Sequence, residues 1–238
     1  DIIEKSKKDK IKSICFVTGV PGAGKTLAGL NLANERHKFG DDEEHAVFLS
    51  GNGPLVDVLQ EALARNDIEN STEKITKSEA LQKAKSFIQN IHHFRDDAIS
   101  VDTPPIEKVV VFDEAQRAWN NEQTSSFMKK KKGIADFDKS EPEFLISVMD
   151  RHHDWAVIIC LIGGGQEINT GEAGLPEWFS AIKNHYPHWN VYVSNQITDI
   201  EYTGNQKLEK LFAGIKYHAI PDLHLSISIR SFRSENVS

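Results

Sequence analysis

A glycine-rich stretch near the amino terminus constrains the fold of this chain more than any other feature. Gly19-Val-Pro-Gly-Ala-Gly-Lys25-Thr26 matches the pattern G-x-x-x-x-G-K-[ST]. It follows an apolar, β-rich run at 13–18 and opens a helical stretch at about 24–37, which is the context that this motif requires. Glycines let several backbone N–H groups face a phosphate, and the helix adds the positive end of its dipole. The residues expected to hold a nucleotide are Gly19, Pro21, Gly22, Ala23, Gly24, Lys25, Thr26 and Leu27.

Two side chains of this loop have expected roles in binding MgATP. Lys25 is expected to reach the β- and γ-phosphates, and the Thr26 hydroxyl to ligate Mg²⁺. A second apolar strand ends in Asp113-Glu114 and supplies the carboxylates that such a site needs. Asp113 fits the metal role, and Glu114 can polarise an attacking water as a general base. This acidic pair favours hydrolysis over phosphoryl transfer to a small metabolite.

Strand and helix patterns alternate along the chain, which predicts an α/β fold with a mainly parallel central sheet and helices on both faces. Periodicity predicts helices at about 24–37, 55–64, 141–151 and 175–184, and one or two helices within 71–96. We expect one domain over 1–238, with a helical insertion at about 67–104, a loop at 97–107 and a polar loop at about 120–140. The strands are expected at 13–18, 46–50, 108–113, 155–162, 190–194 and 223–229.

The composition is that of a soluble globular protein, and the net charge of −7 argues against a protein coated in positive charge. No apolar run approaches the length of a membrane span, and the charged amino terminus has no apolar signal core, so we expect no membrane contact and a cytoplasmic location. Cys15 and Cys160 lie in expected buried strands and are interpreted as structural thiols. Ten histidines are present, without metal-site spacing.

The residues around the acidic pair resemble a known family. Asp113-Glu114-Ala-Gln116-Arg resembles motif II of superfamily 1 helicases and translocases. With segments 48–55, 163–175 and 230–233, the chain resembles the Schlafen-type (group three) DNA/RNA helicase domain family over about 14–238. The resemblance implies a RecA-like P-loop NTPase that uses ATP and Mg²⁺.

The resemblance also implies roles for further residues. Gln116 would link the state of the γ-phosphate to movement, and the alternative is an exposed residue at a helix start. Gln166 would be the γ-phosphate sensor. Arg230, with Arg233 as the second choice, would stabilise the charge of the transferring phosphoryl group, because a guanidinium can meet two of its oxygens. A surface salt bridge is the alternative for both arginines.

Single-stranded DNA or RNA is the partner that the resemblance implies. Ser50 and Asn52 follow the second expected strand and could donate to a nucleic-acid backbone, or could simply serve the chemistry of a turn. The run 129–132 of lysines could touch phosphates or form a solvated loop. Trp119 and the other tryptophans could pack in the core or stack on bases.

Three functions compete at this point. The first is the ATP-hydrolysing first motor domain of a DNA or RNA helicase or translocase. The second is an ATP-dependent switch or assembly module acting on a protein partner, and the third is a small-molecule or nucleotide kinase. The chain ends at Ser238 without a second RecA-like domain, so we expect that domain in a longer chain or a partner protein.

Overall fold

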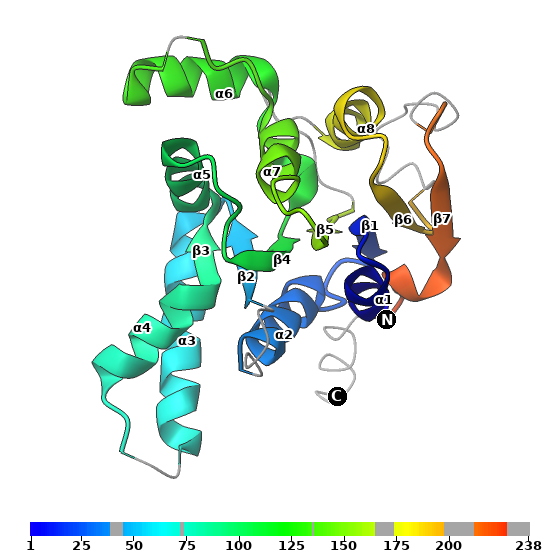
Figure 1. Ribbon diagram of the computed structural model, residues 1–238. Helices are drawn as coiled ribbons and strands as arrows, with labels where there is room; N and C mark the ends of the chain where they lie inside the picture. Colours follow the sequence, from blue (N-terminus) through cyan, green and yellow to red (C-terminus); the bar gives the residue numbers. More distant parts are fainter. Residues whose placement is uncertain (39–44, 72–73, 135, 165–173, 198–211, 228–238) are drawn as a thin grey trace.

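A parallel sheet forms the centre of the molecule in the computed structural model, which describes residues 1–38, 45–71, 74–134, 136–164, 174–197 and 212–227. The strand order is β3-β2-β4-β5-β1-β6-β7, with β8 pairing the end of β1, and all pairings between these described strands are parallel (Figure 1). The predicted α/β fold with a mainly parallel sheet is confirmed. The strands are β1 (Lys12–Gly19), β2 (His45–Ser50), β3 (Ile88–Asn90), β4 (Glu107–Phe112), β5 (Ala156–Leu161), β6 (Asn190–Ser194), β7 (Tyr217–Ile220) and β8 (His224–Leu225).

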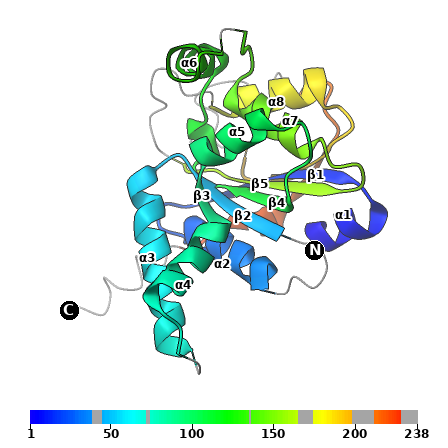
Figure 2. The same cartoon turned by 60° about the vertical axis from the view of Figure 1, so that its left-hand side comes forward.

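Helices cover both faces of this sheet. Figure 2 shows α5, α7 and α8 on one side of the sheet and α1 to α4 on the other. Their bounds are α1 (Ile2–Asp9), α2 (Lys25–Lys38), α3 (Gly53–Asn70), α4 (Lys77–Phe87), α5 (Ile91–Ser100), α6 (Asn121–Phe127), α7 (Glu141–Met149) and α8 (Gly174–His185).

The central strands are buried on both faces, so their apolar side chains alternate between two cores. On β1, Ile14 and Phe16 enter the core under α7 and α8, whereas Cys15 and Val17 enter the core over α2. Burial raises the pKa of the Cys15 thiol to about 12, which agrees with the interpretation of a structural cysteine. The same alternation holds on β4 and β5, with Val110, Phe112, Ile158 and Cys160 in one core and Val109, Val111, Val157 and Ile159 in the other.

Two short helices form where the sequence predicted none. α1 is charged, and it is docked through Ile3, which is buried against the sheet, and capped by the Asp1 carboxylate, which accepts from Ile3 N. The expected polar loop at 120–140 contains α6 and a π-helical turn, η2 (Met128–Lys132). Asn120 caps α6, and Met128 is fully buried below it. Tertiary contacts, which local polarity does not reveal, stabilise both segments.

Two further expectations need correction. The one or two helices expected within 71–96 are observed as α4 and α5, but the short strand β3 between them, which pairs with Phe48–Ser50 of β2, was not predicted. The next helix, α5, runs to Ser100, so the loop expected from 97 begins later. β7 was not predicted, and of the strand expected at 223–229 only β8 is observed within the described residues.

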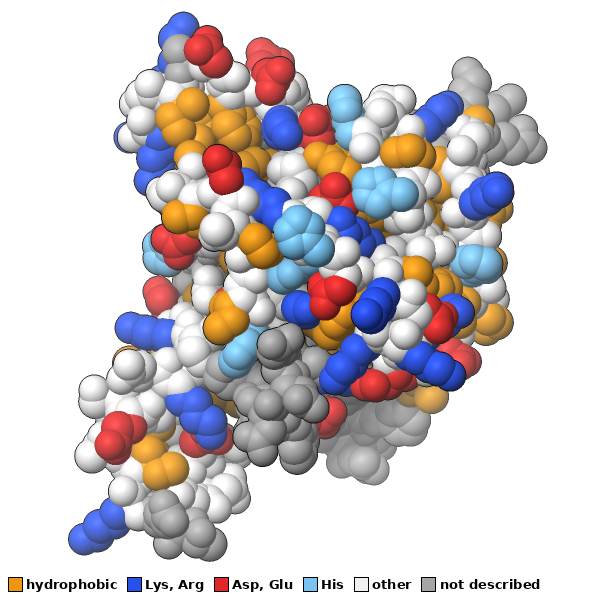
Figure 3. Space-filling view, viewed as in Figure 1, with side chains coloured by type: hydrophobic (Ala, Val, Ile, Leu, Met, Phe, Trp, Pro, Cys, Tyr) orange, Lys and Arg blue, Asp and Glu red, His pale blue; other side chains and the backbone are white. Residues whose placement is uncertain are grey.

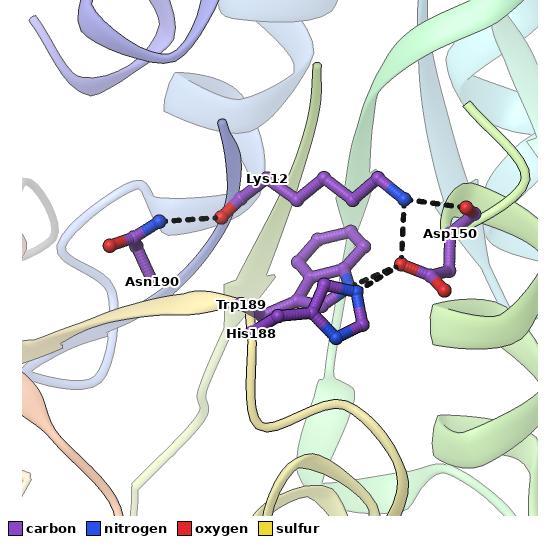
Figure 4. Close-up of polar contacts among 5 residues, drawn as sticks. All are labelled: Lys12, Asp150, His188, Trp189 and Asn190. Atoms are coloured by element: carbon purple, nitrogen blue, oxygen red, sulfur yellow. Dashed lines mark hydrogen bonds and ion pairs between the residues drawn. The ribbon is translucent and has the colours of Figure 1, made fainter. Parts of the chain in front are cut away.

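A polar cluster at the amino ends of β1 and β6 ties three elements together (Figure 4). Lys12 Nζ donates to the Asp150 backbone oxygen at 2.6 Å and to its Oδ1 at 2.8 Å. The same Oδ1 accepts from Trp189 Nε1 at 2.9 Å and lies 2.6 Å from His188 Nε2. The Asp150 carboxylate therefore joins the start of β1, the end of α7 and the turn before β6.

None of the helices in the described part of the chain combines the length and the apolar character needed to cross a membrane.

Candidate nucleotide site

The glycine-rich loop lies between β1 and α2, at the carboxyl ends of the parallel strands, where ligands of α/β sheets bind. Gly22 has φ 78° and Gly24 has φ 84°, a conformation that residues with a Cβ rarely adopt. Lys25 Nζ donates to the backbone oxygen of Gly19 at 2.7 Å and lies 3.4 Å from that of Val20. Burial lowers the pKa of Lys25, and the charges of Glu114 and Asp113 oppose that shift. The Lys25 side chain thus reaches back across the loop and contacts the backbone carbonyl groups of Gly19 and Val20.

Gly19 has a second reason to be glycine. A Cβ at this position would lie 2.9 Å from both Cβ and the backbone oxygen of Leu225 on β8. Val20 N donates to the same oxygen at 3.0 Å, and Thr18 Oγ1 lies 2.9 Å from His224 Nδ1. The β8 segment is therefore packed directly against the first residues of the phosphate loop, which sequence motifs alone did not indicate.

Thr26 and Asp113 meet at the mouth of the site. Thr26 Oγ1 donates to both carboxylate oxygens of Asp113 at 3.2 Å each, and Asp113 N donates to Leu49 O at 2.9 Å, which fixes the residue beyond the end of β4. Burial raises the pKa of Asp113 to about 6, and the charge of Glu114 adds to the rise. Burial makes the Asp113 carboxylate costly to ionise without a nearby positive charge. The carboxylate and the Thr26 hydroxyl together fit Mg²⁺, which takes oxygen ligands and binds through one or two carboxylates plus phosphates.

Glu114 and Gln116 form a bridge to the next strand. Glu114 adopts a left-handed conformation (φ 52°), which turns the chain sharply after β4. Gln116 Nε2 donates to Glu114 Oε2 at 2.5 Å, and Gly163 N, just after β5, donates to Gln116 Oε1 at 3.0 Å. Gln116 is buried, so the alternative of an exposed residue at a helix start is wrong.

Gly163 is a site residue that the sequence did not single out. A Cβ there would lie 2.8 Å from Gln116 Nε2 and 2.9 Å from Glu114 Oε2. The run of glycines after an apolar strand was the available signal, but it does not say which glycine approaches the acidic pair.

Ser50 and Asn52 lie on the turn between β2 and α3, close to the same site. Asn52 Oδ1 caps α3 by accepting from Leu55 N at 3.3 Å, and Ser50 Oγ accepts from Asn52 N at 3.2 Å. Turn chemistry therefore accounts for both side chains, and contact with nucleic acid stays a prediction.

The remaining residues expected at the site are either exposed or outside the described part of the chain. Leu27, on the first turn of α2, is 53% exposed, and Pro21 is also exposed. Gln166, Arg230 and Arg233 lie outside the described residues. Within the described part of the chain, no group of three or more His, Cys, Asp or Glu residues could hold a metal ion by itself.

A family model described as Schlafen group 3, DNA/RNA helicase domain, matches residues 12–238. One similar solved structure is the Hef helicase domain of Pyrococcus furiosus, with a TM-score of 0.42 and 18% sequence identity. The match covers 86% of this chain and 40% of that chain, so this chain spans less than half of that structure. No curated protein sequence matches.

Proposed function

Since the chain belongs to the Schlafen group 3 DNA/RNA helicase domain family, we propose that it is an ATP-binding and ATP-hydrolysing motor domain of a DNA or RNA helicase or translocase. The observation that carries the proposal is the meeting of three parts: the loop that ends in Lys25, the Thr26–Asp113 pair, and Glu114 held by Gln116. These groups come from two segments of the chain, 19–26 and 113–116, which lie at the carboxyl ends of β1 and β4.

In the proposed reaction, the loop binds the phosphates and Lys25 releases the Gly19 carbonyl to contact the β- and γ-phosphates. Thr26 and Asp113 would hold Mg²⁺, which would supply positive charge to neutralise the phosphate oxygens. Glu114 accepts a proton from the water that attacks the γ-phosphorus, while the bond to the β-phosphate oxygen breaks and ADP leaves. The hydrogen bond from Gln116 Nε2 keeps the Glu114 carboxylate in place and occupies its Oε2, so the other oxygen, Oε1, accepts the proton from water.

The charge-stabilising arginine and the γ-phosphate sensor belong to the same proposal. We assign Arg230, with Arg233 as the second choice, to the first role and Gln166 to the second. The contact of Leu225 with Gly19 supports the assignment, since it brings the segment that leads to these arginines beside the phosphate loop. A guanidinium near the loop could then meet two phosphate oxygens.

The proposed partners are single-stranded DNA or RNA and a second RecA-like domain, in a longer chain or in a partner protein. On the face seen in Figure 3, acidic and basic side chains are interspersed, without a broad field of one sign. Ser50 and Asn52, beside the metal site, are proposed contacts to the nucleic acid.

The test is ATP turnover with and without single-stranded DNA and RNA. We expect one polymer to stimulate turnover several-fold. Glu114→Gln should lower turnover by about 100-fold or more, the contribution of a general base, while ATP still binds. Glu122→Gln, an exposed carboxylate on α6, is the matched control and should behave as wild type. Turnover that neither polymer changes would instead favour an ATP-dependent switch acting on a protein.

A further inference from the structure

Trp178 on α8 reaches the turn that carries the proposed general base. Its ring is fully buried, and its Nε1 donates to the backbone oxygen of Ala115 at 2.9 Å. Ala115 follows Glu114 directly and is itself fully buried. Ala118 N donates to the same oxygen at 3.3 Å within the short helix η1 (Ala115–Arg117), so the indole is the closer of these two donors. The chemistry proposed above assigns no role to this tryptophan.

The backbone at Glu114 needs support from the rest of the fold. Glu114 has φ 52°, a left-handed conformation that is unfavourable for a residue with a Cβ. Such a conformation persists only where surrounding contacts hold it, and it is concentrated at functional sites. Arg117 N donates to Glu114 O at 2.8 Å, which closes the turn locally. The bond from Trp178 to Ala115 O adds a contact from a residue 63 positions away along the chain.

Packing fixes the place of the Trp178 ring. Its centroid lies 5.7 Å from that of Phe112, which ends β4 directly before Asp113. It lies 6.2 Å from the ring centroid of Phe16 on β1, in an edge-to-face arrangement with an angle of 82° between the planes. All three rings belong to the core under α7 and α8, on the side of the sheet that carries α8 in Figure 2. The indole N–H is therefore presented to the turn by a ring that contacts both strands leading into the site.

The turn is held at two points by the part of the chain that follows β5. Gly163 N, directly after β5, donates to Gln116 Oε1 at 3.0 Å, and Gln116 in turn donates to Glu114 Oε2. Trp178, farther along the chain, donates to Ala115 O. The first connection holds the carboxylate of the proposed base, and the second holds the backbone that carries it. Loss of the second should therefore let Glu114 leave the position from which it accepts the proton.

We propose that Trp178 is a positioning residue for ATP hydrolysis, an inference that rests on the proposed function. The residue acts through Glu114: its indole N–H holds the Ala115 carbonyl group and so keeps the Glu114 carboxylate aimed at the attacking water. The rate of a reaction is sensitive to such placement, because a displacement of about 1 Å in a catalytic group can cost about 100-fold. Since the hydrogen bond is buried, water does not readily replace it when the indole is removed.

The test is the variant Trp178→Phe, which removes the indole N–H and keeps an aromatic ring in the core. We expect kcat for ATP to fall about 10-fold, the size of one buried hydrogen bond, while KM and the dissociation constant for a fluorescent ATP analogue change less than about 2-fold. Steady-state kinetics and nucleotide titration measure these values. Trp155→Phe is the matched control: Trp155 is 4% exposed, lies in the opposite core and should leave kcat unchanged.

A second variant separates the hydrogen bond from packing. Phe179 lies beside Trp178 on α8, is 1% exposed and packs on Phe16 with ring centroids 4.8 Å apart. Phe179→Leu weakens this packing but keeps the Trp178 N–H, so it should lower the melting temperature and leave kcat unchanged at a temperature where every variant is folded. The proposal is overturned if Phe179→Leu lowers kcat as much as Trp178→Phe does, because packing would then account for the effect.

A double-mutant cycle tests whether Trp178 acts through Glu114. Adding Trp178→Phe to Glu114→Gln should lower kcat no further, because the base that Trp178 positions is already absent. An equal loss in both backgrounds contradicts the positioning role, and so does wild-type kcat in folded Trp178→Phe; the motor function stands in either case. If wild type hydrolyses no ATP, or Glu114→Gln hydrolyses it at the wild-type rate, the proposed function fails and this inference fails with it.

Discussion

Gln116 Nε2 donates a hydrogen bond to Glu114 Oε2 at 2.5 Å, and the other end of the Gln116 amide accepts from the backbone N–H of Gly163 at 3.0 Å. The general base proposed above is therefore linked through one side chain to the loop that follows β5. A movement of that loop would change the position of the Glu114 carboxylate, because the Gln116 amide group is hydrogen-bonded both to Gly163 N and to Glu114 Oε2. This geometry gives Gln116 a positioning role.

Replacing Gln116 with alanine should slow ATP hydrolysis more than it weakens ATP binding. The Glu114 carboxylate would lose the hydrogen bond from the Gln116 side chain and sample other rotamers. We expect kcat to fall about 10-fold or more, with a small change in the dissociation constant for a fluorescent ATP analogue. Steady-state kinetics and nucleotide titration measure the two effects separately. Gln123→Ala on α6 is the control, and an equal loss of binding and turnover would contradict the positioning role.

Lys25→Met should abolish the phosphate contact. We expect turnover to fall by about 100-fold or more, as for other groups aimed at developing phosphate charge. Its stability should change little, since the hydrogen bond from Lys25 Nζ to Gly19 O is replaceable by water. ATP turnover and thermal unfolding measure the two effects. Lys130→Met, an exposed lysine of η2, is the matched control; wild-type turnover in Lys25→Met would rule out the assigned role.

Removing Mg²⁺ should abolish hydrolysis and lower the affinity for ADP. In wild type, added Mg²⁺ with ADP should raise the melting temperature, because a ligand that binds only the folded state stabilises it. Asp113→Asn should lose most of this increase while its ADP-only shift remains. Differential scanning fluorimetry with and without EDTA measures both. A Mg²⁺-dependent increase that persists in Asp113→Asn would move the metal site elsewhere.

Gly19→Ala should destabilise the protein even without nucleotide. The added methyl group would lie 2.9 Å from the Leu225 backbone oxygen, which a rotamer change cannot relieve. We expect a loss of about 1–3 kcal/mol, the usual effect of overpacking, measured by urea unfolding. A normal free energy of unfolding with weakened ATP binding would mean that Gly19 serves the phosphate alone.

Asp150 should make the stability depend on pH. Burial acts to raise its pKa, but hydrogen bonds from Lys12, His188 and Trp189 outweigh burial and hold the pKa below its usual value. A depressed folded-state pKa contributes stability that is present above the unfolded pKa, about 3.9, and is lost as pH falls through the folded value.

Asp150→Asn should therefore cost about 1–3 kcal/mol near pH 7, and the difference from wild type should shrink below about pH 4. Urea unfolding at several pH values measures this difference. Asp154→Asn is the control: Asp154 pairs with Lys108 and its side chain is 41% exposed, so a loss below about 1 kcal/mol is expected. A difference for Asp150→Asn that stays constant across the pH range would contradict this account.

The sequence by itself determined the parts of the site that depend on local chemistry. The turn from Gly19 to Thr26 needs glycines for its positive φ values at Gly22 and Gly24, so the spacing of the motif reveals it. The acidic pair ends an apolar strand, and a strand buried on both faces in a parallel sheet has an apolar pattern that is visible without a structure. These local rules fixed the fold class and the placement of Lys25, Thr26 and Asp113.

Only the tertiary structure decided which distant segments meet. The Gln116–Gly163 bridge, the contact of Leu225 with Gly19, and the hydrogen bond from Trp178 to Ala115 each join segments far apart in the chain. The helices α1 and α6 form in polar sequence because Ile3 and Met128 are buried against the rest of the fold. Such contacts depend on the order of strands in the sheet and on packing between layers, which no local periodicity encodes.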